Sequence, residues 1–220
     1  MKIFHKIFSR KRKRQATDPA VQTTYFKGKS CIKIGTFTYG SENLRIRQWG
    51  EGAGLEIGKF CSIADNVQIF LGGNHRTDWI STYPFGHVHN EYFGDFHIGD
   101  HPSTKGNVII GNDVWIGSGV TIMSGINIGD GAVIAANSTV IGNIPPYQIV
   151  GGNPATFIKS RFSPMITELL LKLQWWHLPL PEIKALMPVL CAPPDENTLA
   201  EKIQLNLATN ECAHTSENSC

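Results

Sequence analysis

The chain has 220 residues, of which 41% are hydrophobic and 17% charged, with 20 basic against 18 acidic side chains. This length and composition fit one globular domain with appendages and exclude a charge-rich disordered chain. The 22 glycines are too few for collagen, and no apolar run approaches the ~20 residues that cross a bilayer.

The first fourteen residues carry seven basic side chains and no acid, which leaves 13 basic and 18 acidic groups in the rest of the chain, a net charge of −5. A mildly acidic body with a short basic arm is not typical of a nucleic-acid-binding domain. We expect residues 1–24 to be a flexible basic arm. The alternative is a weak amphipathic contact with an anionic membrane surface.

The five cysteines are an odd number and form no CxxC pair, so the sequence predicts neither a disulfide framework nor a zinc knuckle. The apolar stretch at the N-terminus is too short and too interrupted for a signal peptide. These two features predict a reducing, cytoplasmic compartment.

A six-residue periodicity decides the fold. It appears in isolation at Ile34, returns at Ile57, Ile63 and Ile69, and then continues without a slip from residue 110 to 144. In the long run the aliphatic position is occupied by Ile110, Ile116, Ile122, Ile128, Ile134 and Val140. Three positions after each of them stands Asp, Gly or Asn, which tolerate a left-handed backbone conformation.

A period of six fits neither an amphipathic helix nor a simple strand alternation. It is typical of a solenoid whose coils each have three short strands, with the aliphatic side chains inward and the Gly or Asn at the corners. We therefore predict a mainly β fold, a left-handed parallel β-helix over residues 25–160.

The repeat is interrupted between Ile69 and Val108. A long insertion in a solenoid lies on the surface and is commonly functional. We expect an excursion loop over about residues 70–107, which holds five of the eight histidines and many aromatic side chains. Such a composition suits binding or chemistry.

Two prolines at 145 and 146 end the repeat. Ser163 followed by Pro164 is a helix start, and Met165, Leu169, Leu170, Leu173 and Trp176 then give one helical face. A second helix is expected from Pro181. We predict a helical extension over residues 161–192 and a polar, partly disordered tail over 193–220.

Four segments resemble the hexapeptide-repeat acyltransferases, and more narrowly their xenobiotic acetyltransferase branch, which contains the hexapeptide-type chloramphenicol and streptogramin acetyltransferases. They are NHRTDWISTYPF at 74–85, IGNDVWIG at 110–117, IVGGNPA at 149–155 and LKLQWW at 171–176. The resemblance covers about residues 55–185. The hexapeptides alone indicate the fold, whereas the NHR…STYPF string is specific to the branch.

The resemblance implies a homotrimer with active sites between subunits, acetyl-CoA as co-substrate, and His75 as the general base that activates an acceptor hydroxyl. Imidazole suits this role because its pKa lies near neutrality. Backbone N–H groups at the Gly-rich corners would stabilise the oxyanion. The acetyl group would pass directly to the acceptor without an acyl-enzyme, because no Ser or Cys has the context of an activated nucleophile, and Cys61 occupies an inward, core position.

The resemblance also implies two further sets of site residues. The cofactor set, for acetyl-CoA, is Gly117, Ala135, Ala136, Asn153, Pro154, Lys159 and Arg161, with Arg161 able to meet a phosphate. The substrate set is Trp79, Tyr83, Phe85 and Trp115. An equal alternative for Trp79, Tyr83 and Phe85 is that they pack the loop against the β-helix. The alternative for Lys159 and Arg161 is a solvated basic surface. No metal ligand is expected.

The acceptor stays open, because the stretch GHVHNEYFGDFHIGDHPSTKGN at 86–107 departs from the branch's pattern. An antibiotic such as chloramphenicol or a streptogramin is one class, and a sugar hydroxyl or the amine of an amino-sugar nucleotide is another. Three rival functions are a zinc enzyme like carbonic anhydrase using loop histidines, a non-catalytic β-solenoid scaffold, and nucleic-acid binding through the basic arm.

Overall fold

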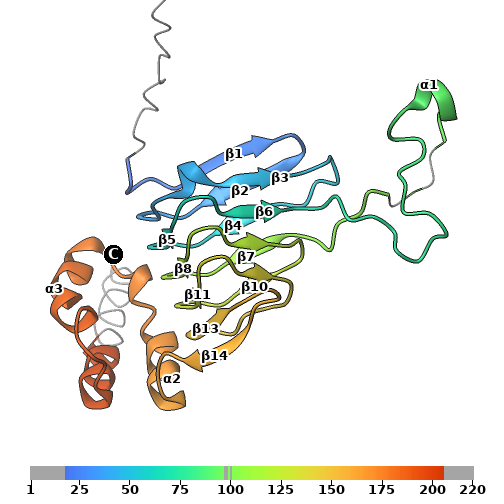
Figure 1. Cartoon of the computed structure of the whole chain (residues 1–220). Coiled ribbons are helices and arrows are strands. Elements are labelled where there is room, and N and C mark those ends of the chain that lie inside the picture. Colours follow the sequence, from blue (N-terminus) through green and yellow to red (C-terminus); the bar gives the residue numbers. More distant parts are fainter. Residues whose placement is uncertain (1–17, 97–98, 100, 206–220) are drawn as a thin grey trace, which may run out of the picture.

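The computed structural model describes residues 18–96, 99 and 101–205, and its strands form three sheets (Figure 1). Sheet A has the order β1 (Thr23–Lys27), β2 (Ser30–Ile34), β4 (Leu55–Ile57), β7 (Val108–Ile110) and β10 (Asn127–Ile128). Sheet B has the order β14 (Thr156–Ser160), β13 (Gln148–Gly151), β11 (Val133–Ile134), β8 (Trp115–Ile116) and β5 (Ser62–Ile63). Sheet C has the order β12 (Thr139–Val140), β9 (Thr121–Ile122), β6 (Gln68–Phe70) and β3 (Arg45–Arg47).

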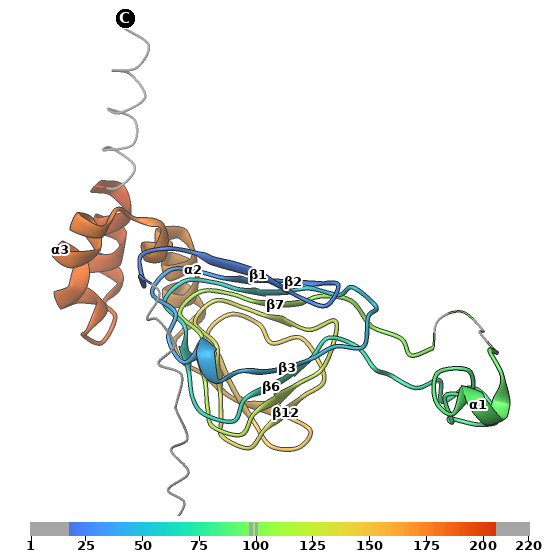
Figure 2. The same ribbon diagram turned by 90° about the horizontal axis from the view of Figure 1, so that it is seen from above.

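The chain visits the three sheets in turn, from β4 to β5 to β6, then β7 to β8 to β9, then β10 to β11 to β12. Strands of successive turns pair in parallel, so that Ile57 lies beside Ile110 and Ile110 beside Ile128. The isolated forerunner at Ile34 belongs to an earlier turn, in which Tyr39 bridges Ser62 in parallel. Figure 2 shows sheets A and C on different sides of this coil. The fold is therefore mainly β with parallel sheets.

The aliphatic positions of the repeat are buried, as the periodicity predicts. All six of the long run belong to one core that continues through Ile57, Ile63 and Ile69. Five of the six expected corner residues have a left-handed backbone conformation: Asp113, Gly119, Gly125, Gly131 and Asn137. Asn143 does not, and its side-chain oxygen instead accepts a hydrogen bond from the Asn127 backbone N–H at 2.8 Å.

Cys61 is a core residue, as its place in the repeat predicts. Its side chain is fully buried, and burial raises the pKa of the thiol to about 12. Because the thiolate is the nucleophilic form of cysteine, this thiol is inert at neutral pH.

The C-terminal part is helical, with α2 (Pro164–Leu173), the short η2 (Trp175–His177), α3 (Leu180–Leu190) and a further helix over 196–205. Ser163 caps α2 as predicted, and its hydroxyl accepts from the Ile166 N–H at 3.2 Å. The predicted face of α2 is wrong at Met165, which is 53% exposed while Ile166 is buried. The buried residues Ile166, Leu170 and Leu173 follow one another at helical spacing. The buried face of α2 therefore begins at Ile166, one residue later than predicted.

Residues 71–107 leave sheet C after β6 and return to sheet A at β7, with the short helix α1 (Asn90–Phe93) at the far end (Figure 1). A second short helix, η1 (Ser41–Asn43), precedes β3. Within the described ranges, the helices are all too short or too polar to span a membrane. Most of the arm (1–17) and the end of the tail (206–220) lie outside the described residues.

Candidate active site

The excursion loop has a neck, the two segments around Asn74 and Ser103 where the chain leaves and rejoins the coil, and this neck is hydrogen-bonded to the coil. Asn74 and Ser103 form an antiparallel bridge in which each backbone N–H donates to the other's carbonyl at 2.9 Å. The buried Ser124, between β9 and β10, accepts from the Asn74 side-chain amide at 3.1 Å and from the Lys105 N–H at 3.2 Å. His75 follows Asn74 directly, so these hydrogen bonds fix the position of the His75 backbone.

We expect Ser124→Ala to loosen this neck. The substitution leaves the part-buried Asn74 amide and Lys105 N–H donors without their acceptor, which costs about 1 kcal/mol. Hydrogen exchange should therefore accelerate at the Asn74 and Ser103 amides and stay unchanged in the sheets. Ser118→Ala, which removes an exposed hydroxyl bonded to the Asp65 carbonyl, is the matched control. Equal exchange in both variants would contradict the anchoring role.

The ring of His75 is oriented by a backbone carbonyl. Its Nδ1 lies 2.7 Å from the Thr82 carbonyl oxygen. Because a carbonyl only accepts, this bond places the proton on Nδ1 and leaves the lone pair of a neutral ring on Nε2. The group that orients His75 is therefore a backbone carbonyl. The exposed Nε2 can act as a base.

A buried histidine packs beside His75. His101 is 5% exposed, its ring centre lies 5.0 Å from that of His75 at an interplanar angle of 74°, and Trp79 stacks on it at 5.3 Å. Burial lowers the pKa of His101, and the neighbouring His75, His87 and Arg76 lower it further. His101 is therefore neutral at neutral pH.

Tyr83 and Phe85, two more of the aromatic residues predicted to bind substrate, lie in the same loop. Tyr83 and Phe85 pack together with ring centres 4.8 Å apart, and Phe93 of α1 contacts Phe85 at 5.1 Å. Trp79 also lies 5.2 Å from the Arg76 guanidinium. Arg76 in turn binds Asp78 through two donors, which lowers the pKa of that carboxyl to about 2.

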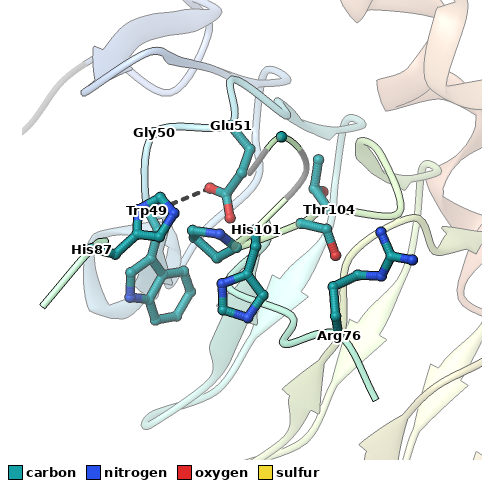
Figure 3. A pocket seen from close by; sticks show the side chains of 10 residues that line it. Trp49, Gly50, Glu51, Arg76, His87, His101 and Thr104 are labelled. Carbon is teal, nitrogen blue, oxygen red and sulfur yellow. Dashed lines mark hydrogen bonds between the residues drawn. The ribbon is translucent and has the colours of Figure 1, made fainter. Parts of the chain in front are cut away.

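Two cavities meet at His101. The larger, of about 810 Å³, opens between the loop that follows β3 and the neck of the excursion (Figure 3). Its lining is Trp49, Gly50, Glu51, Arg76, His87, Gly99, His101, Pro102, Ser103 and Thr104. The smaller, of about 130 Å³, has Trp79, Tyr83 and Phe85 in its wall together with His87 and His101.

Sequence reasoning missed Trp49, Glu51 and the packing of His101. Glu51 accepts from the Gly73 N–H at 2.6 Å and from the Trp49 N–H at 3.1 Å (Figure 3). Gly73 has a φ of 77°, and a Cβ there would lie 2.5 Å from the Trp49 ring. The Gly72–Gly73 pair before His75 was the signal in the sequence, since a glycine marks close approach of another group.

The expected acetyl-CoA residues and Trp115 lie on another part of the fold, on and after sheet B (Figure 1). Trp115 of β8 is 58% exposed, and the pairing of sheet B puts it in one row with Val133, Ile149 and Lys159. Gly117 packs against the backbone of Ala136 in the next turn, where a Cβ would lie 2.6 Å from its nitrogen. Ala135 follows β11, and Asn153 and Pro154 form the exposed turn between β13 and β14.

Arg161 differs from the others in this set because it is held by the protein itself. Its guanidinium donates to the Gly131 carbonyl at 2.6 Å, lies 3.5 Å from the Asp113 carboxylate, and packs on the Tyr147 and Phe162 rings at 5.4 and 5.0 Å. Lys159 is exposed on β14. The structure thus groups His75, Trp79, Tyr83 and Phe85 in the loop, and the remaining site residues around sheet B.

The described histidines of the loop (His75, His87, His89 and His101) form no metal site. Among the described residues, no group of three or more His, Cys, Asp or Glu is placed to hold a metal ion. His97, one of the histidines considered from sequence, lies outside the described residues.

The chain is similar to a family model and to curated relatives. Residues 107–142 match the model of the bacterial transferase hexapeptide (six repeats). A chloramphenicol acetyltransferase of Klebsiella aerogenes is 47% identical over 140 residues, 63% of this chain and 66% of that protein. One of Morganella morganii is 41% identical over 174 residues, 73% of this chain and 82% of that protein.

A virginiamycin A acetyltransferase of Staphylococcus aureus is 48% identical over 140 residues, 62% of this chain and 63% of that protein. The match thus spans about two thirds of the length of the Klebsiella and Staphylococcus relatives. The hexapeptide match and the 41% identity over 82% of the Morganella protein show the family. The chain belongs to the hexapeptide-repeat acyltransferase family, in its xenobiotic acetyltransferase branch.

Proposed function

We propose that this chain is an acetyl-CoA-dependent acetyltransferase in which His75 is the general base. The observation that carries the proposal is the contact between His75 Nδ1 and the Thr82 carbonyl, because it leaves Nε2 free to take a proton. Nε2 accepts the proton of the acceptor hydroxyl while its oxygen attacks the thioester carbonyl. The C–S bond then breaks, and the imidazolium returns the proton to the leaving CoA thiolate.

The fold proposed for this activity is a left-handed parallel β-helix over residues 25–160, with the excursion loop over about 70–107. The basic arm (1–24), the helical extension (161–192) and the tail (193–220) complete the predicted division of the chain, but the helix over 196–205, with Leu199 buried in the helical cluster, carries the helical part into the predicted tail. The turn-by-turn order of the three sheets supports the β-helix. The cytoplasmic location inferred from the cysteines stays a prediction.

A homotrimer would bring the two groups of site residues together. Within one chain, the loop around His75 points away from the sheets, while Trp115 and the expected acetyl-CoA residues lie on sheet B (Figure 1). A site between subunits, in which His75 of one chain faces Trp115 and the corner at Gly117 of its neighbour, accounts for this separation. Arg161 is less suited than Lys159 to bind a CoA phosphate, because its Nη1 already contacts the Gly131 carbonyl and the Asp113 carboxylate.

The acceptor we propose is an antibiotic of the kind named for the relatives. A sugar or amino-sugar acceptor is the second candidate, favoured by the polar lining of the larger cavity, where Glu51, Arg76, Ser103 and Thr104 stand beside Trp49.

The test of the function is acceptor-dependent release of CoA from acetyl-CoA. The panel holds chloramphenicol, a group A streptogramin, several sugars and several amino-sugar nucleotides. Turnover with one acceptor supports the function and identifies the class. Binding of acetyl-CoA without turnover of any acceptor would contradict the acceptor classes proposed, and no binding of acetyl-CoA would contradict the function itself.

Lys159 and Arg161 should differ in what they contribute. We expect Lys159→Ala to raise the KM for acetyl-CoA a few-fold with unfolding unchanged, because an exposed charge contributes about 0–1 kcal/mol. Arg161→Met should instead lower the free energy of unfolding, by about 1–3 kcal/mol, because the partly buried Asp113 carboxylate and the Gly131 carbonyl lose their partner. Kinetics in acetyl-CoA and urea denaturation of the two variants check this, and a purely kinetic effect of Arg161→Met would contradict it.

A further inference from the structure

A buried polar atom without a partner stands next to the proposed base. The Nε2 of His101 is inaccessible to solvent and makes no hydrogen bond among the described residues. A buried nitrogen without a partner costs about 1–3 kcal/mol, so a phenylalanine of similar shape would be less costly at this position. The nitrogen is too enclosed to touch an acceptor in the adjoining cavities.

The packing around His101 restrains the orientation of the His75 ring. The bridge between Asn74 and Ser103 holds the two strands of the neck together, which places His101 across from His75. The His75 ring meets the His101 ring at 74°, while Trp79 lies nearly parallel to His101 at 19°. Rotation of the His75 ring about its χ2 would break both this packing and the bond from Nδ1 to the Thr82 carbonyl.

From this geometry we propose that His101 is a positioning residue, whose buried ring, backed by Trp79, holds the His75 imidazole with Nε2 directed at the acceptor. The inference rests on the proposed function of His75. Its surroundings keep His101 uncharged: burial disfavours its protonated form, and the neighbouring His75, His87 and Arg76 disfavour it further, while Glu51 is the acid that lines the same cavity. A neutral ring at this position packs against His75 without placing a second positive charge beside the imidazolium that forms when His75 takes a proton.

The test follows the His75 ring directly, in the protein without acceptor. With ¹⁵N-labelled histidine, the imidazole nitrogens of His75 report which of them carries the proton. In the wild type we expect a protonated Nδ1 and an unprotonated Nε2. His101→Phe keeps a planar ring and should keep this pattern, whereas His101→Leu fills a similar volume without a ring and should give a mixture of the two tautomers.

Kinetics complete the test. We expect His101→Leu to lower kcat on the order of 10-fold to 100-fold, the cost of a misplaced catalytic group, with KM for acetyl-CoA unchanged, and His101→Phe to restore most of kcat. His89→Asn, at an exposed histidine of the same loop with positive φ, is the control, since asparagine tolerates that conformation. A wild-type tautomer pattern in His101→Leu, or equal losses in the Leu and Phe variants, would overturn the proposal.

The tautomer measurement needs no acceptor and no turnover. If the wild type neither binds acetyl-CoA nor transfers acetyl while His101→Leu still loses the His75 tautomer, the proposed function fails and the positioning role stands. If the wild type is active and the tautomer is indifferent to residue 101, the positioning role fails and the function stands.

Discussion

His75→Ala is expected to lower kcat by about 10²–10⁴-fold, the usual contribution of a general base. The reason is that neither described neighbour of His75 can replace Nε2: the Thr82 carbonyl is too weakly basic to take a proton, and the Nε2 of His101 is enclosed. Acetyl-CoA binding should be unchanged, because the expected cofactor residues lie around sheet B. Initial rates of CoA release and calorimetric titration with acetyl-CoA measure the two effects separately.

Two variants sharpen this prediction. His75→Gln retains a polar side chain of similar length but no basic nitrogen, so its kcat should fall as far as that of His75→Ala. His89→Asn controls for loop disturbance and should retain the wild-type rate. If His75→Gln keeps more than about a tenth of kcat, the loss in the alanine variant is one of loop structure, and the base must be sought elsewhere.

The turns of the coil could be predicted from sequence because each turn repeats the same local demand. A buried aliphatic residue every six positions and a left-handed corner residue three positions later are both local signals, and they place β7 to β12 within a residue or two. Asn143 is the exception among the corner residues: its backbone is not left-handed, and its side-chain oxygen accepts a hydrogen bond from the Asn127 N–H instead.

The details of the candidate site could not be predicted, because they depend on contacts between distant segments. His101 reaches His75 only through the pairing of Asn74 with Ser103, and no period in the loop encodes that pairing. In the same way, the partners of Arg161 are Asp113 and Gly131, which lie on two different turns of the coil. The sequence alone does not show that these turns lie beside Arg161. The motif predicts His75 as the base, and the structure adds the Thr82 carbonyl that lies against its Nδ1.

A substitution in the stacked core should have the largest effect on stability, and β7 offers a matched pair for it. Ile110 is 2% exposed and lies between Ile57 and Ile128, whereas its neighbour Ile109 is 44% exposed. Ile110→Ala should lower the free energy of unfolding by about 2–5 kcal/mol, because it removes buried apolar surface and leaves a cavity that adjacent turns cannot close. Ile109→Ala removes the same atoms from the outer face and should cost less than about 1 kcal/mol.

Urea denaturation of the two variants, followed by circular dichroism, measures the difference. Each turn contributes a single side chain from sheet A to this ladder, and its neighbours there, Ile57 and Ile128, are stiff β-branched residues, so the space left at Ile110 stays unfilled and the two losses should differ severalfold. Equal losses would mean either that the ladder relaxes along its axis or that Ile109 is itself buried when chains associate. Repeating the comparison over a range of protein concentrations separates the two, because only burial between chains makes the cost of Ile109→Ala depend on concentration.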